Sequence, residues 1–233
     1  MASKEQITKF INEISQIAME ESNGRILPSI CIAQACLESA YGTAPKMKNA
    51  NAVFGIKVGK NKVHFGTAWK GKAYSTKTRE CYDGVNYVDI TDMFRAYNTI
   101  KESVQDYFDM LYNCSRYKKA VGETSPLKCI TYIKMGGYAT APGYVDSIMS
   151  IVNKYNLYQY DQTPLLYYGS NGLAVKRVQK ILYNYRFLTT ESQIDGIYGK
   201  KTIEAVKNFQ ESRGLEIDGV VGVKTWTELR REI

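Results

Sequence analysis

Residues 28–42 constrain the fold more than any other stretch of this sequence. They begin at Pro28, continue through a nearly unbroken series of apolar and small residues, and end with Glu38 and Gly42. Proline costs a helix nothing at its first position, where its missing N–H would have no partner, and glycine commonly stops a helix. We therefore predict a buried helix that carries Glu38 near its end.

The predicted position of Glu38 is unfavourable for a negative charge. A carboxylate in the last turn of a helix faces the negative end of the helix dipole, and apolar neighbours solvate it poorly. Both effects disfavour the ionised form, so the pKa of Glu38 is expected to be raised. A carboxyl group that stays protonated near neutral pH is the general acid that acid-catalysed glycoside hydrolysis needs.

Other patterns predict a mostly helical α+β fold. Ser3-x-x-Gln6 is a capping box, and apolar residues at helical spacing follow it. Residues 43–97 lose this periodicity, and short strands are expected at Tyr74–Glu80 and Tyr87–Ile90, with Asp83-Gly84 as turn material. Helices are expected again after Thr99, after Ser125 and from about residue 142 to residue 156.

Four short motifs follow one another along the first two thirds of the chain. They are Ala33–Gly42, Asn51–Lys57, Phe94–Tyr97 and Gly137–Thr140. In this order they resemble the glucosaminidase family of cell-wall hydrolases, glycoside hydrolase family 73. The resemblance implies a lysozyme-like catalytic domain, mostly helical, with a small β-lobe over a cleft, and it implies that Glu38 is the general acid.

The resemblance also points to Glu80 as a second catalytic carboxylate, because Thr78-Arg79-Glu80 is similar to the family's Thr-x-Glu on the β-lobe. Glu80 would either activate water as a general base or support an oxazolinium intermediate formed by the substrate's own acetamido group. Inverting enzymes hold their two carboxyl groups roughly 6.5–9.5 Å apart, a distance that the sequence does not give. The alternative is a solvent-facing strand residue beside Arg79.

Tyr138 is the third catalytic candidate. In the family, Gly-Tyr-Ala-Thr is usually followed by Asp-Pro, whereas this chain has Ala141 at the position of the aspartate. The loss removes a local support of the loop but leaves the tyrosine. Its hydroxyl would orient the acetamido group or water near the scissile sugar, and the alternative is a packing tyrosine ahead of a helix.

Six further residues are candidates for substrate binding within the cleft. They are Phe54, Gly55, Lys57, Trp69, Arg95 and Tyr97. Gly55 would permit a close approach of the backbone, and Trp69 could stack on a sugar face. Arg95 would pair with a carboxylate, which could be Glu80, a lactyl group of the substrate or a structural partner.

The sequence does not favour a mechanism that uses a metal ion or a catalytic thiol. His64 is the single histidine, whereas a catalytic zinc site typically uses several, so we expect neither a metal nor a cofactor. His64 itself is expected to be solvated. The five cysteines form no Cys-x-x-Cys pair, and Cys31 and Cys36 lie in the apolar helix, where buried thiols are expected.

The charge of the chain favours an anionic partner. The net charge is +8, and between Glu38 and Glu80 there are nine lysines and arginines and no acidic residue. These residues form either a solvated surface or a basic rim beside the cleft that attracts a polyanion. No nucleic-acid motif accompanies the charge, so we expect the partner to be the bacterial wall.

The last third of the chain contains a weak internal repeat. Asp195–Thr202 is echoed by Asp218–Thr225, and each copy reads as a glycine-supported turn that precedes a helix. Residues 165–230 resemble the peptidoglycan-binding module of wall hydrolases, which implies a three-helix wall-binding domain. We predict a catalytic domain at residues 1–160, a linker around residues 158–164, and a peptidoglycan-binding domain at residues 165–233.

The N-terminus has no apolar segment typical of a signal peptide, and no stretch is apolar enough to cross a membrane. We therefore expect synthesis in the cytoplasm, no membrane insertion, and action at the cell wall after release, as in a phage endolysin. A virion-associated lysin or a non-classically exported autolysin would have the same sequence features. A monomer is expected.

Three functions compete at this point. The leading hypothesis is an endo-β-N-acetylglucosaminidase that cleaves GlcNAc-β-1,4-MurNAc bonds in peptidoglycan. A muramidase or lytic transglycosylase would use a similar fold on the neighbouring bond. A non-catalytic wall-binding or virion structural protein is the third, and the presence of both Glu38 and Glu80 argues against it.

Overall fold

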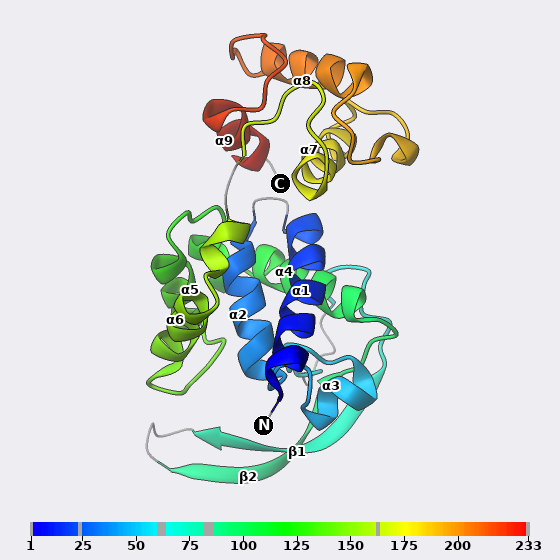
Figure 1. The fold of residues 1–233 in the computed structure, drawn as a ribbon. Helices are drawn as coiled ribbons and strands as arrows, with labels where there is room; N and C mark the ends of the chain where they lie inside the picture. Colours follow the sequence, from blue (N-terminus) through cyan, green and yellow to red (C-terminus); the bar gives the residue numbers. More distant parts are fainter. Residues whose placement is uncertain (1, 23–24, 60–63, 82–85, 162–163, 232–233) are drawn as a thin grey trace.

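The computed structural model describes residues 2–22, 25–59, 64–81, 86–161 and 164–231 of the 233-residue chain. Two large hydrophobic cores organise them, beside a small third cluster of Val58, Trp69 and Tyr97. The first is formed by residues between Phe10 and Leu157, and the second by residues between Leu166 and Leu229. Figure 1 shows the second body, α7 to α9, stacked on one end of the first.

The first body contains six α-helices, two 3₁₀ helices and a two-stranded sheet among its described residues. Its elements are α1 Lys4–Glu21, α2 Pro28–Glu38, α3 Pro45–Ala50, β1 Ala73–Cys81, β2 Tyr87–Arg95, α4 Ile100–Asn113, η1 Ser115–Ala120, α5 Pro126–Met135, α6 Tyr144–Lys154 and η2 Leu157–Tyr160. The prediction of a mostly helical domain with a small β-lobe is confirmed. So are the capping box of Ser3 and Gln6 and the capping of α4 by Thr99.

The helix α2 lies at the centre of this body. Its first nine residues, Pro28 to Cys36, are all buried, and it packs against α1, α5, α6 and η2. At its start the backbone N–H of Ser29 donates to Asp161 Oδ1 at 2.8 Å, which satisfies a donor that has no partner inside the helix. The predicted buried helix is therefore confirmed, and Glu38 is its last residue.

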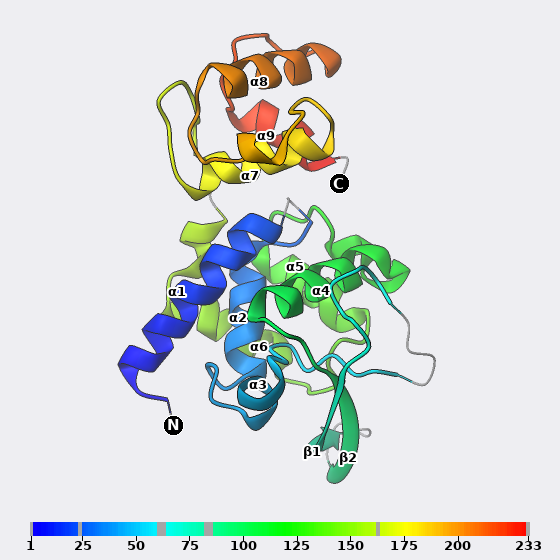
Figure 2. The same cartoon turned by 90° about the vertical axis from the view of Figure 1, so that its right-hand side faces the viewer.

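The strands β1 and β2 form an antiparallel hairpin that projects away from the helices (Figure 2). Their pairing runs from Ala73 opposite Arg95 to Cys81 opposite Tyr87, so β2 extends five residues beyond the predicted Ile90. The longer strand arises because β1 supplies partners along its whole length, which local propensity does not reveal. The predicted Asp83-Gly84 turn lies outside the described residues.

A buried ionic network holds the base of the hairpin on α4. Arg95 Nη1 donates to Asp106 Oδ1 at 2.9 Å and to Oδ2 at 3.0 Å, and the Tyr97 hydroxyl donates to Oδ2 at 2.6 Å. The Arg95 guanidinium also lies 4.4 Å from the centroid of the Trp69 ring. Both charges are excluded from water, so each depends on the other for solvation.

The second body consists of α7 Leu173–Asn184, η3 Glu191–Gln193, α8 Lys200–Ser212 and α9 Val223–Arg231. It contains the predicted repeat, each copy built around a buried glutamine, Gln179 or Gln210. Each side-chain amide donates to the aspartate of its Asp-Gly turn, at 2.9 and 2.7 Å, and accepts the N–H of the turn glycine, at 2.8 and 2.9 Å. Each turn is therefore supported by its own buried glutamine, and the two sets of hydrogen bonds are equivalent.

An ion pair joins the two bodies where α1 contacts α7. Lys180 Nζ lies 2.8 Å from Glu21 Oε2, and Lys101 Nζ lies 3.4 Å from Glu21 Oε1. Burial alone would raise the pKa of Glu21, but the two ammonium groups outweigh it and lower that pKa overall. Glu21 therefore remains ionised at the junction.

Lys180→Met is expected to lower the free energy of unfolding by about 1–2 kcal/mol, between the values of exposed and buried ion pairs. Because the folded-state pKa of Glu21 is lowered, its contribution is complete above the ordinary pKa and is lost as the pH falls through the folded-state value. Urea denaturation at neutral and acidic pH measures the loss of stability in the variant and the dependence of that loss on pH. The matched control is Lys201→Met, which removes an exposed lysine of α8; equal midpoints for the two variants would contradict the prediction.

Among the described residues, no helix combines the length and apolarity that are needed to cross a bilayer.

Candidate active site

All four sequence motifs meet at one cleft of about 730 Å³. The cleft lies where the end of α2, the segment 54–59 and the base of the hairpin face the loop 137–141 and the start of α6. Glu38, Phe54, Phe94 and Tyr138 contribute to its walls, one from each motif. Segments more than 100 residues apart in sequence therefore build a single site.

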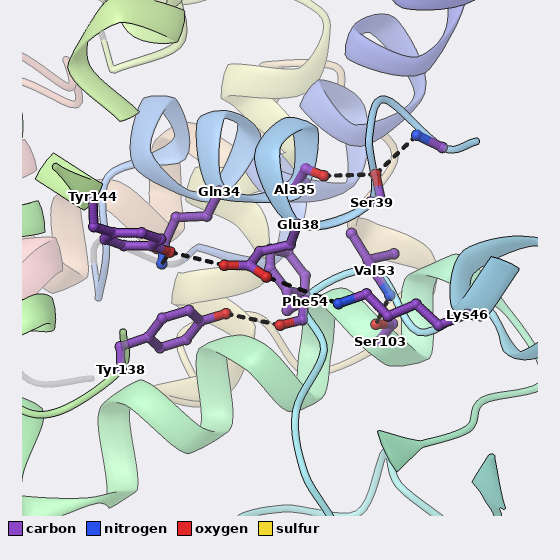
Figure 3. Close-up of polar contacts among 11 residues, drawn as sticks. Gln34, Ala35, Glu38, Ser39, Lys46, Val53, Phe54, Ser103, Tyr138 and Tyr144 are labelled. Atoms are coloured by element: carbon purple, nitrogen blue, oxygen red, sulfur yellow. Dashed lines mark hydrogen bonds and ion pairs between the residues drawn. The ribbon is translucent and has the colours of Figure 1, made fainter. Parts of the chain in front are cut away.

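The chain reverses immediately after Glu38. Ala40, Tyr41 and Gly42 all have positive φ, at +48°, +56° and +79°, so α2 stops before the glycine that was predicted to stop it. Ser39 braces this turn by donating to the Ala35 carbonyl at 2.6 Å and accepting from the Gly42 N–H at 2.8 Å. This turn holds the Glu38 side chain at the edge of the cleft (Figure 3).

Each oxygen of the Glu38 carboxyl faces a donor (Figure 3). The Tyr144 hydroxyl donates to Oε1 at 3.2 Å, and Lys46 Nζ lies 3.8 Å from Oε2. Behind Tyr144, Gln34 Nε2 donates to the Tyr144 oxygen at 2.9 Å, and the Tyr107 hydroxyl donates to Gln34 Oε1 at 2.5 Å. A buried chain of donors therefore ends on Glu38.

Tyr144 and Lys46 were not among the sequence-based candidates. Burial first, and then the negative charge of Glu38, raise the pKa of Tyr144, so its hydroxyl remains a donor. A sequence signal did exist for this network, since Gln34 lies four residues before Glu38 and shares its helix face. Nothing local distinguished Lys46 from the other lysines in its basic stretch.

Tyr138 borders the same cleft from the loop before α6. Its hydroxyl donates to the Phe54 carbonyl at 3.2 Å, and its ring packs edge-on against Tyr107 and Tyr117. Burial, followed by the proximity of Tyr144 and Glu38, raises the pKa of Tyr138. Tyr138 is thus partly buried against the core and also lines the cleft, and its catalytic role stays a prediction.

Glu80 lies on β1, where its backbone pairs with Val88 near the far end of the hairpin. Its side chain lies outside the described part of the structure, so its catalytic role stays a prediction. Thr78 of the same motif does contribute to the cleft.

The six substrate-binding candidates divide into two groups. Phe54, Gly55 and Lys57 line the cleft, where Lys57 Nζ pairs with Asp92 Oδ2 at 2.8 Å. The other three, Trp69, Arg95 and Tyr97, are buried beneath the base of the hairpin.

The burial of this second group differs from the sequence-based expectation. Trp69 is only 2% exposed and packs against His64 and Arg95, so its ring offers no open face to a sugar. Arg95 borders the cleft, but its guanidinium is paired with Asp106, which is the structural partner left open by the sequence. Trp69, Arg95 and Tyr97 therefore stabilise the base of the hairpin beside the cleft by packing and ion pairing.

Other side chains add no further chemistry. His64 is exposed, as expected, and one side of its ring stacks on Trp69 with 4.8 Å between ring centroids. Cys31 and Cys36 are buried thiols, as predicted, and burial raises the pKa of Cys36 to about 12. Within the described ranges, His, Cys, Asp and Glu form no group of three or more that could hold a metal ion.

The family profile described as mannosyl-glycoprotein endo-beta-N-acetylglucosaminidase matches residues 14–157, more than half of the chain. The chain belongs to the glucosaminidase family. All four motifs and the cleft fall within the matched region. A second profile, of a peptidoglycan binding domain, matches residues 171–229, which contain the duplicated turns.

Individual relatives agree with this assignment. The exo-glucosaminidase LytG of Bacillus subtilis is 34% identical over 161 residues, which are 66% of this chain and 53% of LytG. The peptidoglycan hydrolase FlgJ of Vibrio cholerae is 34% identical over 140 residues, or 56% of this chain and 39% of FlgJ. The chain thus spans about half of these relatives' length or less.

The fold agrees as well. The catalytic domain of the autolysin Auto from Listeria monocytogenes superposes with a TM-score of 0.55 at 30% sequence identity. The match covers 69% of this chain and 90% of the Auto domain.

Proposed function

We propose that this protein is a peptidoglycan hydrolase that acts as an endo-β-N-acetylglucosaminidase on GlcNAc-β-1,4-MurNAc bonds. The observation that carries the proposal is the half-buried carboxyl group of Glu38, set in a cleft lined by all four family motifs. Membership of the glucosaminidase family and the match to a peptidoglycan binding domain support the choice of substrate.

In the proposed reaction, Glu38 transfers its proton to the glycosidic oxygen as the bond from C1 breaks. Either a water molecule activated by Glu80, or the acetamido oxygen of the GlcNAc residue, attacks C1 from the opposite face. In the first route the attacking water supplies the hydroxyl on C1 and gives its proton to Glu80, and Glu38 takes a new proton from solvent. In the second route a water molecule then opens the oxazolinium at C1, supplying the hydroxyl, and gives its proton to Glu38. In this proposal Tyr138 orients the acetamido group or the water, and no cofactor takes part.

The second body would hold the enzyme on its substrate. We propose domains at residues 1–160 and 165–233, with the latter binding the insoluble wall and raising the local concentration of glycan. The net charge of +8 suits the anionic wall polymer. The protein would act there as a monomer.

The reduced ends of a peptidoglycan digest test the proposal directly. Purified peptidoglycan is digested with the full chain, reduced with borohydride and analysed by mass spectrometry, and we expect reduced GlcNAc at the new ends. Reduced MurNAc would indicate a muramidase, and anhydro-MurNAc a lytic transglycosylase. Binding to the wall without release of fragments would indicate a non-catalytic protein.

The same digest distinguishes endo from exo action by fragment length. An endo enzyme releases internal oligosaccharides of mixed length early in the reaction, whereas early release of only the terminal residue would indicate exo action.

A further inference from the structure

Lys46 brings its ammonium group to the cleft-facing oxygen of Glu38. It is the second residue of α3, and its Nζ lies 3.8 Å from Glu38 Oε2 (Figure 3). The same Nζ lies 5.3 Å from the centroid of the Phe94 ring. The Lys46 and Glu38 side chains are 19% and 23% exposed. At this degree of burial, water weakens the attraction between the two charges only in part.

The backbone beside the Lys46 ammonium has a glycine, Gly55, where a larger residue would contact the lysine. Gly55 has a φ of +61°, and a methyl group at its Cα would overlap Lys46 Nζ. The carbonyl of Lys46 accepts the Ala52 N–H at 3.2 Å, which ties α3 to the segment that carries Gly55. The position of the ammonium therefore follows from the fold around it as well as from its own side-chain conformation.

The two donors on the Glu38 carboxyl differ in how firmly they are held. Tyr144 is buried and fixed by Gln34, whereas Lys46 reaches Oε2 on a flexible stem from the cleft wall. A neutral carboxyl group no longer attracts an ammonium ion, so protonation of Glu38 weakens the Lys46 contact first. The geometry therefore favours Oε2 as the oxygen that carries the proton into the cleft.

We propose that Lys46 is a positioning residue for Glu38, which pairs with its carboxylate in the substrate-free enzyme and sets the upper pH limit of hydrolysis. This inference rests on the proposed function, since it assumes that Glu38 is the general acid. It also adds a role for a residue that none of the four sequence motifs singled out.

The other described groups around Glu38 differ from Lys46 in their charge or in their pairing. From α6 and its preceding loop, Tyr144 and Tyr138 face the carboxyl group as neutral phenols whose pKa values are raised. The other cations among the described lining residues of the cleft lie on other elements and have their own interactions: Lys57 pairs with Asp92, Arg95 pairs with Asp106, and Arg116 lies over the Tyr117 ring.

The direction of the pH effect follows from the sign of the Lys46 charge. An opposite charge within about 4–6 Å favours the ionised carboxylate and lowers a carboxyl pKa by roughly 1–3 units. On the alkaline side, kcat/KM falls as the general acid of the substrate-free enzyme deprotonates. The alkaline limb is the part of the pH profile in which kcat/KM falls as the pH rises. Removing the ammonium should therefore move this limb to higher pH by about 1–3 units.

The test is the pH dependence of kcat/KM for release of reducing ends from soluble peptidoglycan strands. The full chain is compared with Lys46→Met, Lys46→Gln and Lys46→Arg, and with Lys48→Met as a matched control. Lys48 is an exposed lysine of the same helix, so the control changes the net charge equally. We expect both neutral Lys46 variants to shift the alkaline limb upward, while Lys46→Arg and Lys48→Met retain the unmodified limb.

Two outcomes separate this inference from the proposed function. If the unmodified enzyme cleaves peptidoglycan but the limbs of Lys46→Met and Lys46→Gln coincide with that of Lys48→Met, the role of Lys46 is overturned and the proposed function stands. If the unmodified enzyme releases no reducing ends, the proposed function itself fails. Circular dichroism confirms that each variant used in the comparison is folded, and two neutral replacements keep the test open if one does not fold.

Discussion

Glu38→Gln is expected to lower kcat on peptidoglycan by roughly 10²–10⁴-fold, the usual contribution of a positioned general acid. Glutamine has nearly the same shape as glutamate but has no proton to give to the departing glycosidic oxygen. Its amide oxygen can still accept the Tyr144 hydroxyl, which now donates to Oε1 at 3.2 Å. The loss should therefore fall on the chemical step, with little change in the fold.

Release of reducing ends measures this loss, and co-sedimentation with insoluble wall measures binding. The matched control is Glu13→Gln, the same chemical change at an exposed position of α1, and it should behave as the unmodified enzyme. Glu38→Gln should still bind the wall, because the module at residues 171–229 is unaltered. An activity within threefold of the unmodified enzyme would exclude Glu38 as the general acid.

The parts of the site that could be predicted from sequence depend on local patterns. Pro28 and the apolar residues after it favour a buried helix through local patterning, so Glu38 could be placed near the end of that helix. The motif around Gly55 was likewise recognisable because it is contiguous. Each of these features is set by residues that are close together in the chain.

The parts that could not be predicted depend on contacts between distant segments. Tyr144 reaches Glu38 across 106 positions, and the only local hint was a polar residue, Gln34, on the same helix face. Trp69 was a candidate for sugar stacking because of its aromatic side chain alone. Its burial is imposed by Arg95 and the hairpin, which sequence periodicity does not register.

The largest effect on stability is expected from Asp106→Asn, which should lower the free energy of unfolding by about 3–5 kcal/mol. This change keeps the volume of the side chain but removes the negative charge that pairs with the Arg95 guanidinium, which is 2% exposed. Trp69 lies against Arg95, so its fluorescence follows unfolding at this place. A Trp226→Phe background removes the signal of the second body, whose core contains Trp226.

Asp109→Asn is the matched control, because the two aspartates share a helix and differ mainly in burial. Asp109 also lies 2.9 Å from an arginine, Arg25, but these side chains are 26% and 18% exposed. Burial raises the pKa of Asp109 in spite of Arg25, so neutralising it should cost less than about 1 kcal/mol. Equal losses for the two variants would show that burial does not decide the strength of these pairs.

A double variant separates the free-energy cost of removing one charge of the pair from the net contribution of the whole pair to stability. Arg95→Met/Asp106→Leu removes both buried charges, and with them the desolvation penalty, so it should be more stable than Asp106→Asn. It should not recover fully, because the Tyr97 hydroxyl, which donates to Asp106 at 2.6 Å, would lose its acceptor at a cost of about 1–3 kcal/mol. Adding Tyr97→Phe should recover the stability lost in this way, since it removes the unpaired hydroxyl as well. If the triple variant is no more stable than Asp106→Asn alone, the network stabilises the hairpin base through its geometry rather than through charge compensation.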